Sequence, residues 1–362
     1  MNILHLTPAF NYVDGRSYYV FLLLKYLKRS GHNVFLYTNG GDSFDRLEEL
    51  DIPVFSDTYL SSKSSFIKSV NLIFEFTKKN KIHIIHSHHR YFELIANSVS
   101  SIYKPKLKTV FTALSIIDKR YLIEYKSDKI IAVSNSVKNM LTGKFNIKKS
   151  KIVLIPNFTD SEESDQENDN SKNVLQKSYN ANQKTHLLSI GRFHKEKDYN
   201  TLLNAVSILK DLNIDLTLIG EGSEKASYVK FIRENSLKVE LISPRRNLKE
   251  YFQKTDICIL PSVRDPFPGF MLQSGLHKKP FIGSDVDGIS ELIVDNQNGL
   301  LFKKRNPSDL SEKIKKFIVE KDLARECGEN LQTVIKKKYT EKIVIPMIEE
   351  VYYNLTTQVF CF

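Results

Sequence analysis

Two basic side chains in one loop, Arg192 and Lys197, have the chemistry needed to hold a phosphate. They lie in the run Gly191-Arg192-Phe193-His194-Lys195-Glu196-Lys197-Asp198, which follows the predicted strand 186–190. A guanidinium donates a bidentate pair of hydrogen bonds to phosphate oxygens, and an ammonium supplies a point charge. Gly191 allows the backbone to turn, so both groups could reach one anion. A solvated basic loop explains these residues equally well, because two basic residues in one loop are common.

A second candidate segment runs from residue 256 to residue 291. Asp265 precedes a short stretch rich in proline and glycine, and residues 270–278 are predicted to form a helix. The first turn of such a helix presents peptide N–H groups that can bind an anion. Asp265 and Gln273 could face the same ligand, with Gln273 bonding to a ribose hydroxyl. The alternative, which spacing alone favours, is that Asp265 caps the loop and Gln273 lies on the helix surface.

Four histidines lie close together in the first half of the chain: His83, His86, His88 and His89. Histidine clusters can bind zinc, but these residues lie on and just after a predicted strand, where alternate side chains point to opposite faces. Only His86 and His88 share a face, and the stretch contains no Cys, Asp or Glu. We therefore expect no metal site. His88, at the carboxyl end of the strand, is predicted to contact substrate, and a buried core position is the alternative for His86.

These segments belong to a chain in which short apolar strands alternate with amphipathic helices. That alternation favours parallel sheets covered by helices on both faces, which bind ligands at the carboxyl ends of their strands. The predicted strands are 3–6, 33–38, 82–86, 109–112, 129–133, 186–190, 216–219, 256–260 and 280–283, and the predicted helices are 18–29, 66–79, 201–210, 308–320 and 344–355.

The alternating pattern is interrupted once, by a polar run with no apolar residue at positions 160–170. Such a run cannot bury a core, so we predict a mobile loop between two domains. The expected division is a first domain at 1–158, an acidic linker at 159–183 and a second domain at 184–343. The last segment, 344–362, is expected to pack back on the first domain.

Composition limits the function classes further. The chain has 362 residues, enough for two cores, and a net charge of +11. No stretch is long and apolar enough for a membrane span, and the N-terminus resembles no signal peptide. The three cysteines, Cys258, Cys327 and Cys361, are an odd number and far apart, which is typical of reduced thiols in the cytoplasm. The positive charge suits an anionic membrane face or an anionic substrate, and a solvated lysine-rich surface is the alternative. No nucleic-acid motif accompanies the charge, so a nucleic-acid partner is not expected.

The motifs follow one another in an order that resembles the retaining glycosyltransferases of family four. The resemblance extends over nearly the whole chain, and each motif is weak by itself while the ordered set is specific. The motifs are Leu4-His5-Leu6-Thr7-Pro8 with Gly15, Ile85-His86-Ser87-His88, Ile131-Ala132-Val133-Ser134, Ile155-Pro156-Asn157, Ser189-Ile190-Gly191-Arg192 with Lys197, Leu218-Ile219-Gly220-Glu221-Gly222, Leu260-Pro261-Ser262, Asp265 to Gln273, Gly283-Ser284-Asp285, Gly288, Glu291 and Asn298-Gly299-Leu300.

The resemblance implies a GT-B architecture, in which two Rossmann-like domains face each other across a central cleft. It implies a metal-independent enzyme that uses a nucleotide sugar as co-substrate, with a UDP sugar favoured and a GDP sugar second. The enzyme would be cytoplasmic and peripheral on the inner face of the cell membrane. The acceptor would be a cell-surface glycan of lipopolysaccharide or capsule type, or a lipid-linked sugar.

The resemblance also assigns roles to individual residues. Arg192 and Lys197 would bind the diphosphate, Asp265 would approach the donor sugar, and Gln273 would approach the ribose. The further donor-site residues would be Gly15, Gly191, Gly222, Arg245, Pro268, Gly269, Phe270, Met271 and Leu272, with His88 among the catalytic residues.

Three departures from the family pattern leave a second function open. Asp265 and Gln273 stand where the family has two glutamates, Leu114 stands where it has a histidine, and the pairs Asp14-Gly15 and Asp287-Gly288 replace glycine pairs. Leucine cannot donate a hydrogen bond. The alternative is therefore a catalytically silent GT-B protein that serves as a partner or glycan-binding subunit.

Overall fold

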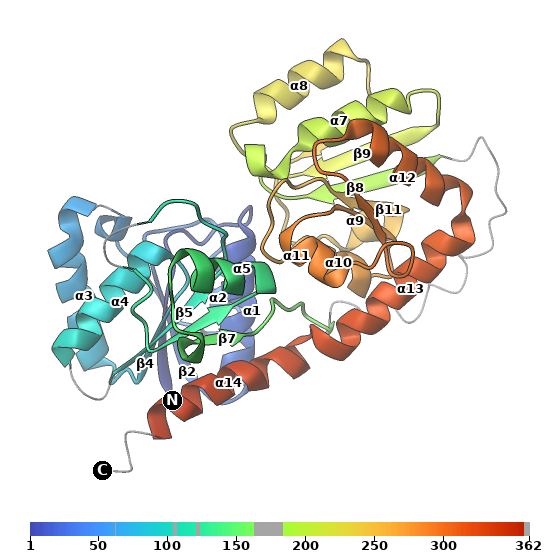
Figure 1. Cartoon of the computed structure of the whole chain (residues 1–362). Helices are drawn as coiled ribbons and strands as arrows, with labels where there is room; N and C mark the ends of the chain where they lie inside the picture. Colours follow the sequence, from blue (N-terminus) through green and yellow to red (C-terminus); the bar gives the residue numbers. More distant parts are fainter. Residues whose placement is uncertain (62, 104–106, 121–123, 163–183, 358–362) are drawn as a thin grey trace. The chain divides into compact units, whose positions relative to one another are not determined.

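The computed structural model describes residues 1–61, 63–103, 107–120, 124–162 and 184–357 and divides the chain into two compact units (Figure 1). Unit 1 is Met1–Asn157 together with the C-terminal segment from Glu341, and unit 2 is Phe158–Thr340. The structure thus places the boundaries near residues 158 and 341, where the sequence analysis expected 158 and 344.

The start of the predicted mobile linker belongs to the folded part of unit 2. Asp160 and Ser161 are buried, and Thr159 forms a parallel bridge with Thr340. This bridge joins the point where the chain enters unit 2 to the point where it leaves. The prediction of a loop from residue 160 is therefore wrong for these first residues, because the pairing of Thr159 with Thr340 carries them inside. Residues 163–183 of the predicted linker lie outside the described residues.

Unit 1 contains a sheet of seven parallel strands in the order β3-β2-β1-β4-β5-β6-β7. Most of these strands are short apolar runs that are buried on both faces, whereas Phe55 and Ser56 of the edge strand β3 are exposed. Their bounds are β1 (Asn2–Leu6), β2 (Asn33–Thr38), β3 (Val54–Ser56), β4 (Ile84–Ser87), β5 (Lys108–Ala113), β6 (Lys129–Ala132) and β7 (Ile152–Leu154).

Helices cover both faces of this sheet. On one face, α3 and α4 pack their apolar side chains against Leu4, Leu6 and Ile85. On the other face lie α1 and α14, which pack against each other. The helices of unit 1 are α1 (Gly15–Arg29), α2 (Asp45–Glu48), α3 (Phe66–Lys79), α4 (Arg90–Tyr103), α5 (Asn135–Asn139) and α14 (Glu341–Thr357), with short helical turns at Thr58–Ser61, Lys63–Ser65, Met140–Lys144 and Lys149–Lys151.

Unit 2 repeats the architecture with six parallel strands in the order β10-β9-β8-β11-β12-β13. The strands are β8 (Thr185–Ile190), β9 (Ile214–Ile219), β10 (Val239–Ile242), β11 (Ile257–Leu260), β12 (Phe281–Ser284) and β13 (Leu300–Phe302). The helices are η6 (Lys195–Lys197), α7 (Tyr199–Ile208), α8 (Lys225–Glu234), α9 (Lys249–Lys254), α10 (Gly269–Leu276), α11 (Asp287–Leu292), α12 (Pro307–Val319) and α13 (Lys321–Lys338).

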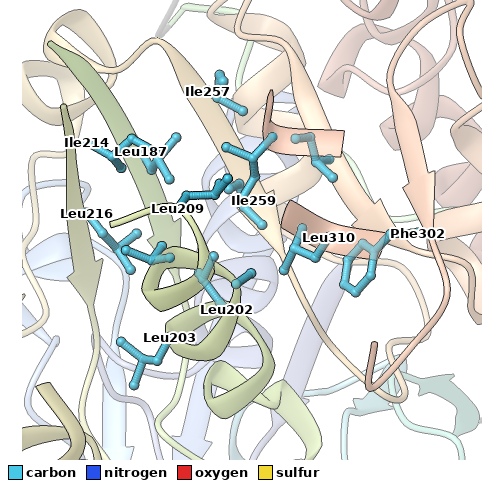
Figure 2. Packing of buried hydrophobic residues seen from close by; sticks show 14 of the residues in the cluster. Leu187, Leu202, Leu203, Leu209, Ile214, Leu216, Ile257, Ile259, Phe302 and Leu310 are labelled. Carbon is cyan, nitrogen blue, oxygen red and sulfur yellow. The ribbon is translucent and has the colours of Figure 1, made fainter. Parts of the chain in front are cut away.

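The core of unit 2 lies between its sheet and the helices α7 and α12. Figure 2 shows apolar side chains from the strands meeting those of the two helices, among them Leu187, Leu216, Ile257, Ile259, Leu202, Leu203 and Leu310. These residues are almost fully buried, and burial of each large aliphatic side chain contributes about 1.5–3 kcal/mol. This packing fixes β8 and β11 side by side and so sets the position of the loops that follow them.

The predicted strands and helices are present, with small shifts at their ends. Helix α1 begins at Gly15 rather than Tyr18, because the Asp14 side chain accepts a hydrogen bond from the Arg16 backbone N–H and caps the helix. Strand β4 begins at Ile84 rather than Ile82, because the Ile82 N–H bonds to the Thr77 carbonyl at the end of α3.

Cys258 and Cys327 are buried and in no disulfide, and Cys361 lies outside the described residues. Among the described residues, no helix has the length and apolar character needed to cross a membrane.

Candidate functional site

In unit 2 the strand order reverses between β8 and β11, which are hydrogen-bonded neighbours with Leu187 opposite Ile257. In an open parallel sheet, ligands bind in the crevice outside the carboxyl ends of the strands at such a switch point. The loop after β8 begins at Gly191, and the loop after β11 begins at Pro261. The loops of both candidate segments in the second half of the chain therefore lie at the position where this fold binds ligands.

The side chain of Phe193 anchors the loop after β8 in the core of unit 2. This side chain is fully buried against Tyr199 and Tyr228, and its backbone N–H donates to the Glu221 carbonyl at 2.8 Å. Because Phe193 points inward, Arg192 before it is left exposed. Arg192 pairs with no carboxylate within the described parts of the chain.

Gly191 opens the same loop where space is limited. A Cβ added there would lie 2.9 Å from the hydroxyl oxygen of Tyr199. Gly222, in the loop after β9, has a φ of 153°, and an added Cβ would overlap the backbone oxygen of Phe193. Glycine at these two positions therefore lets the loops after β8 and β9 pack closely. Arg245, after β10, is exposed on the next loop of the same edge.

Lys197 and Asp265 meet in the structure. The Lys197 Nζ lies 2.5 Å from Oδ2 of Asp265, which is only 6% exposed. The Ser262 hydroxyl donates to the same oxygen at 3.2 Å. Thus the loops after β8 and β11 bring together two residues that lie 68 positions apart in the sequence.

The predicted helix after Asp265 is α10, which begins at Gly269 and ends at Leu276 rather than running over 270–278. Pro268 is its N-cap residue, and the side chains of Phe270, Met271 and Leu272 are buried in the core. These residues therefore anchor the helix, and any contact with a ligand would come from their backbone. The side chain of Gln273 is also mostly buried, at 8% exposure.

In unit 1, the corresponding switch point lies between β1 and β4, where His5 of β1 is the register partner of His86. His88 follows β4, and its Nε2 lies 3.1 Å from Nδ1 of His5. His86 bonds through Nδ1 to the hydroxyl of Tyr352 on α14 and through Nε2 to the hydroxyl of Thr112 on β5, both at 2.6 Å. Ligand atoms of the three rings lie within 4.8 Å of one another. We call His5, His86 and His88 the histidine cluster.

Burial determines the charge of the histidine cluster. All three side chains are at most 2% exposed, and burial lowers the pKa of His5 to about 3 and the pKa values of His86 and His88 well below their usual range. The rings are therefore neutral at physiological pH. Because the structure places His88 in the core, its predicted contact with substrate remains an expectation that the geometry does not support.

The spacing of the histidines in the sequence did not indicate that His5 belongs to this cluster. His5 lies about 80 residues before His86, and only the pairing of β1 with β4 brings them together. The expectation that His86 and His88 share a face is consistent with their close rings, whose centroids lie 4.3 Å apart. Both nitrogens of His86 have hydrogen-bond partners, whereas Nε2 of His5 and Nδ1 of His88 are buried without a partner among the described residues.

Two other predicted positions of unit 1 lie at the same edge of the sheet. Gly15 is exposed at the first turn of α1, and an added Cβ would meet no atom within 4 Å. Asp14 beside it pairs with the Arg16 guanidinium at 2.5 Å. Leu114 directly follows β5 and is half-buried, so no hydrogen-bonding side chain occupies that position.

Comparison with known proteins agrees with this geometry. The family model described as Glycosyltransferase Family 4 matches residues 13–163, and the one described as Glycosyl transferases group 1 matches residues 171–334. An uncharacterized glycosyltransferase from Methanocaldococcus jannaschii is 28% identical over 376 residues, which is 98% of this chain and 99% of that protein.

A further relative and a solved structure extend the comparison. The N,N'-diacetylbacillosaminyl-diphospho-undecaprenol alpha-1,3-N-acetylgalactosaminyltransferase of Campylobacter jejuni is 30% identical over 159 residues, 44% of this chain and 42% of that protein. The crystal structure of Anabaena HepE in complex with UDP-glucose is similar with a TM-score of 0.80 at 14% identity, covering 98% of this chain and all of that one. The two Rossmann-like units are thus those of the GT-B fold. Together, the two family matches and the full-length relative show that the chain belongs to the glycosyltransferases of the group 1 and family 4 type.

Proposed function

We propose that the protein transfers a sugar from a nucleotide sugar, with a UDP sugar as the favoured donor and a GDP sugar second, and that the switch point of unit 2 binds this donor. The observation that carries the proposal is the contact between Lys197 and Asp265, with Arg192 exposed on the loop that also holds Lys197. A phosphate group and a sugar hydroxyl are the two ligand groups that such a combination of cations and carboxylate would accept.

The proposed reaction breaks the bond between C1 of the donor sugar and the diphosphate oxygen. The acceptor hydroxyl forms the new bond to C1 on the same face, which retains the anomeric configuration, and its proton passes to the departing phosphate oxygen. Negative charge grows on that oxygen as the bond breaks, and Arg192 and Lys197 stabilise it by preorganised electrostatics. These cations supply the positive charge, so we propose that the reaction needs no metal ion.

The remaining donor contacts follow from the elements around Lys197. Asp265 would accept a hydrogen bond from a hydroxyl of the donor sugar, and the peptide groups of the first turn of α10 would face the same sugar. Gln273 would lie near the ribose and Arg245 near the base. Structural similarity to HepE, whose crystal structure contains UDP-glucose, supports a UDP sugar as the first donor to test.

We propose a cell-surface glycan or a lipid-linked sugar as the acceptor. The name of the Campylobacter jejuni relative specifies a sugar on diphospho-undecaprenol as what it acts on. The net charge of +11 suits an anionic membrane face carrying such an acceptor. On α3, Ile67 is 75% exposed beside the exposed Lys68. We therefore place the proposed peripheral membrane contact, on the cytoplasmic side, at α3.

The proposal is tested by combining ligand binding with product analysis. UDP, GDP, ADP and CMP, with their common sugar conjugates, are screened by thermal shift, because a ligand that binds only the folded state raises the melting temperature. The UDP sugars are then incubated with the protein, with and without EDTA, and released UDP is measured. We expect a shift with UDP, UDP release from one UDP sugar, and no effect of EDTA.

Two further outcomes decide the finer points. An NMR spectrum of the glycosidic product reports whether the anomeric configuration is retained. Sedimentation with vesicles of phosphatidylglycerol against phosphatidylcholine, for the wild type and an Ile67→Ser variant, tests the membrane contact. If no nucleotide shifts the melting temperature and no sugar is released, the proposal fails, and the protein is better explained as a silent partner or glycan-binding subunit.

A further inference from the structure

Asp287, the first residue of α11, has an unusual backbone conformation. It follows β12, the neighbour of β11 in the sheet, and its φ is 42°, in the left-handed region. A residue with a Cβ is disfavoured there, and such strain persists only where the surroundings maintain it. Glycine would adopt this conformation without a steric penalty. The presence of aspartate at this position therefore calls for a physical reason.

The Asp287 side chain provides one, because it holds the backbone of Asp265. Its Oδ2 accepts a hydrogen bond from the Asp265 N–H at 3.0 Å, and the N–H of the next residue, Gly288, donates to the Asp265 carbonyl at 3.1 Å. The peptide groups on both sides of Asp265 are thus fixed by two consecutive residues at the start of α11.

The contact between the two segments is tight. A Cβ added to Gly288 would overlap the carbonyl oxygen of Pro266. Ser284 of β12 also donates through its hydroxyl to the Ser262 carbonyl, which adds a third hydrogen bond between the two segments. These contacts leave the loop after β11 little freedom to move relative to the start of α11.

The backbone hydrogen bond determines where the Asp265 carboxylate lies. That carboxylate accepts from Lys197 at 2.5 Å and from Ser262 at 3.2 Å. Aspartate has a short side chain, so a shift of its backbone moves the carboxylate by a similar distance. Without Asp287, the buried N–H of Asp265 would lose its partner, and the loop would relax to satisfy it.

We propose that Asp287 is a positioning residue for donor transfer, which holds the Asp265 carboxylate against Lys197 through the Asp265 backbone N–H. The inference rests on the proposed function, since it assigns Asp265 to the sugar of the donor. It predicts that the hydrogen-bond acceptor of Asp287 matters for the sugar part of the donor and not for the nucleotide part.

Three substitutions separate the acceptor, the charge and the backbone strain. Asp287→Gly removes the acceptor and relieves the strain. Asp287→Asn keeps an acceptor oxygen and removes the charge, and asparagine tolerates the left-handed region better than most residues. Lys278→Gly is the matched control, because Lys278 is exposed in the same unit and has a φ of 55°, so it tests strain relief alone.

For each variant, the melting temperature, the Kd for UDP and the kcat/KM for the UDP sugar that the wild type uses are measured. The melting temperature of Asp287→Gly should fall by no more than the loss of one hydrogen bond explains. Its Kd for UDP should stay within twofold of the wild-type value. Its kcat/KM should fall about 10- to 100-fold, since a small misplacement of a catalytic group has effects of that size. Asp287→Asn should recover most of the lost rate, and Lys278→Gly should keep the wild-type rate.

The outcomes distinguish this inference from the proposed function. If the wild type binds no nucleotide and uses no UDP sugar, the proposed function fails and the inference fails with it. If the wild type is active and Asp287→Gly retains its kcat/KM, only the inference is overturned. The inference is also overturned if Asp287→Asn loses as much rate as Asp287→Gly, or if UDP binding falls in parallel with the rate.

Discussion

In unit 1 the switch point between β1 and β4 holds His5, His86 and His88, whereas in unit 2 the switch point between β8 and β11 holds Lys197 and Asp265. Both sheets reverse their strand order at this point. The three rings of unit 1 are neutral and at most 2% exposed. In unit 2, Lys197 is half-buried and Arg192 is exposed. The same topology thus carries a closed polar core in one unit and accessible charges in the other.

The difference arises from the elements that cover each switch point. Helix α14 of unit 1 places Tyr352 against His86, and its Glu349 lies 2.8 Å from Nε2 of His32. In unit 2, Phe193 is buried beneath the loop after β8 and turns Arg192 outward. The comparison teaches that strand order indicates where a site can form, whereas side chains and covering helices decide what it can bind.

The largest expected effect comes from removing the charge at the switch point of unit 2. Lys197→Ala should lower the kcat/KM for the donor about 100- to 1,000-fold, the range found for loss of one preorganised donor to a developing anion. Lys195→Ala is the matched control, because Lys195 is exposed on the same loop, and it should keep its rate. Steady-state assays of UDP release measure both. Equal rates in the two variants would contradict a special role for Lys197.

The second-largest expected effect is a loss of stability at acidic pH that is specific to unit 1. Because the folded state holds the histidine cluster neutral, only the unfolded chain takes up protons below the ordinary histidine pKa of 6.5. Stability is therefore fully present above pH 6.5 and falls as the pH drops towards 3. At pH 5, His5 alone should lower the free energy of unfolding by about 2 kcal/mol relative to neutral pH. His86 and His88 should lower it further.

Hydrogen exchange of peptides from each unit, at pH 7 and pH 5 and corrected for intrinsic rates, measures this effect. Unit 1 should lose protection before unit 2, whose described residues include no comparable cluster. A His5→Phe variant should show a weaker pH dependence than the wild type. Parallel loss of protection in both units would mean that the histidine cluster does not control acid stability.

A smaller effect concerns the anchoring of α14 in unit 1. Tyr352→Phe removes the hydroxyl that bonds to His86 and leaves a buried ring nitrogen without that partner, which should lower the free energy of unfolding by about 1–3 kcal/mol. The neighbouring Tyr353 is 50% exposed, and Tyr353→Phe should change stability by less than about 0.5 kcal/mol. Urea denaturation followed by circular dichroism compares the two. Equal stabilities would show that the contact between Tyr352 and His86 contributes little.

The same contrast explains what could be predicted from the sequence. The loops that carry Lys197 and Asp265 were found because each directly follows a predicted strand, and parallel strands bring their carboxyl ends to one edge. His5 was missed because its link to His86 depends on the pairing of β1 with β4, which local patterns do not reveal.

Other features were hidden for different physical reasons. Helix α13 was not predicted, because charged and polar residues make up most of it and its buried residues form a narrow stripe of Ala324, Cys327, Gly328, Leu331 and Ile335. The role of Asp287 depends on a left-handed backbone and on a contact made by its side chain with the peptide of a residue 22 positions away. Neither the backbone conformation nor this contact can be predicted from residue type or spacing alone.

Hydrogen exchange with and without UDP tests most directly whether the switch point of unit 2 binds the nucleotide sugar. We expect UDP to protect peptides covering residues 191–197 and the first turn of α10, and we expect Lys197→Ala, but not Lys195→Ala, to remove this protection. Peptides covering the histidine cluster should be unchanged. Protection confined to residues 84–89 of unit 1, or equal protection in Lys197→Ala and the wild type, would contradict the account.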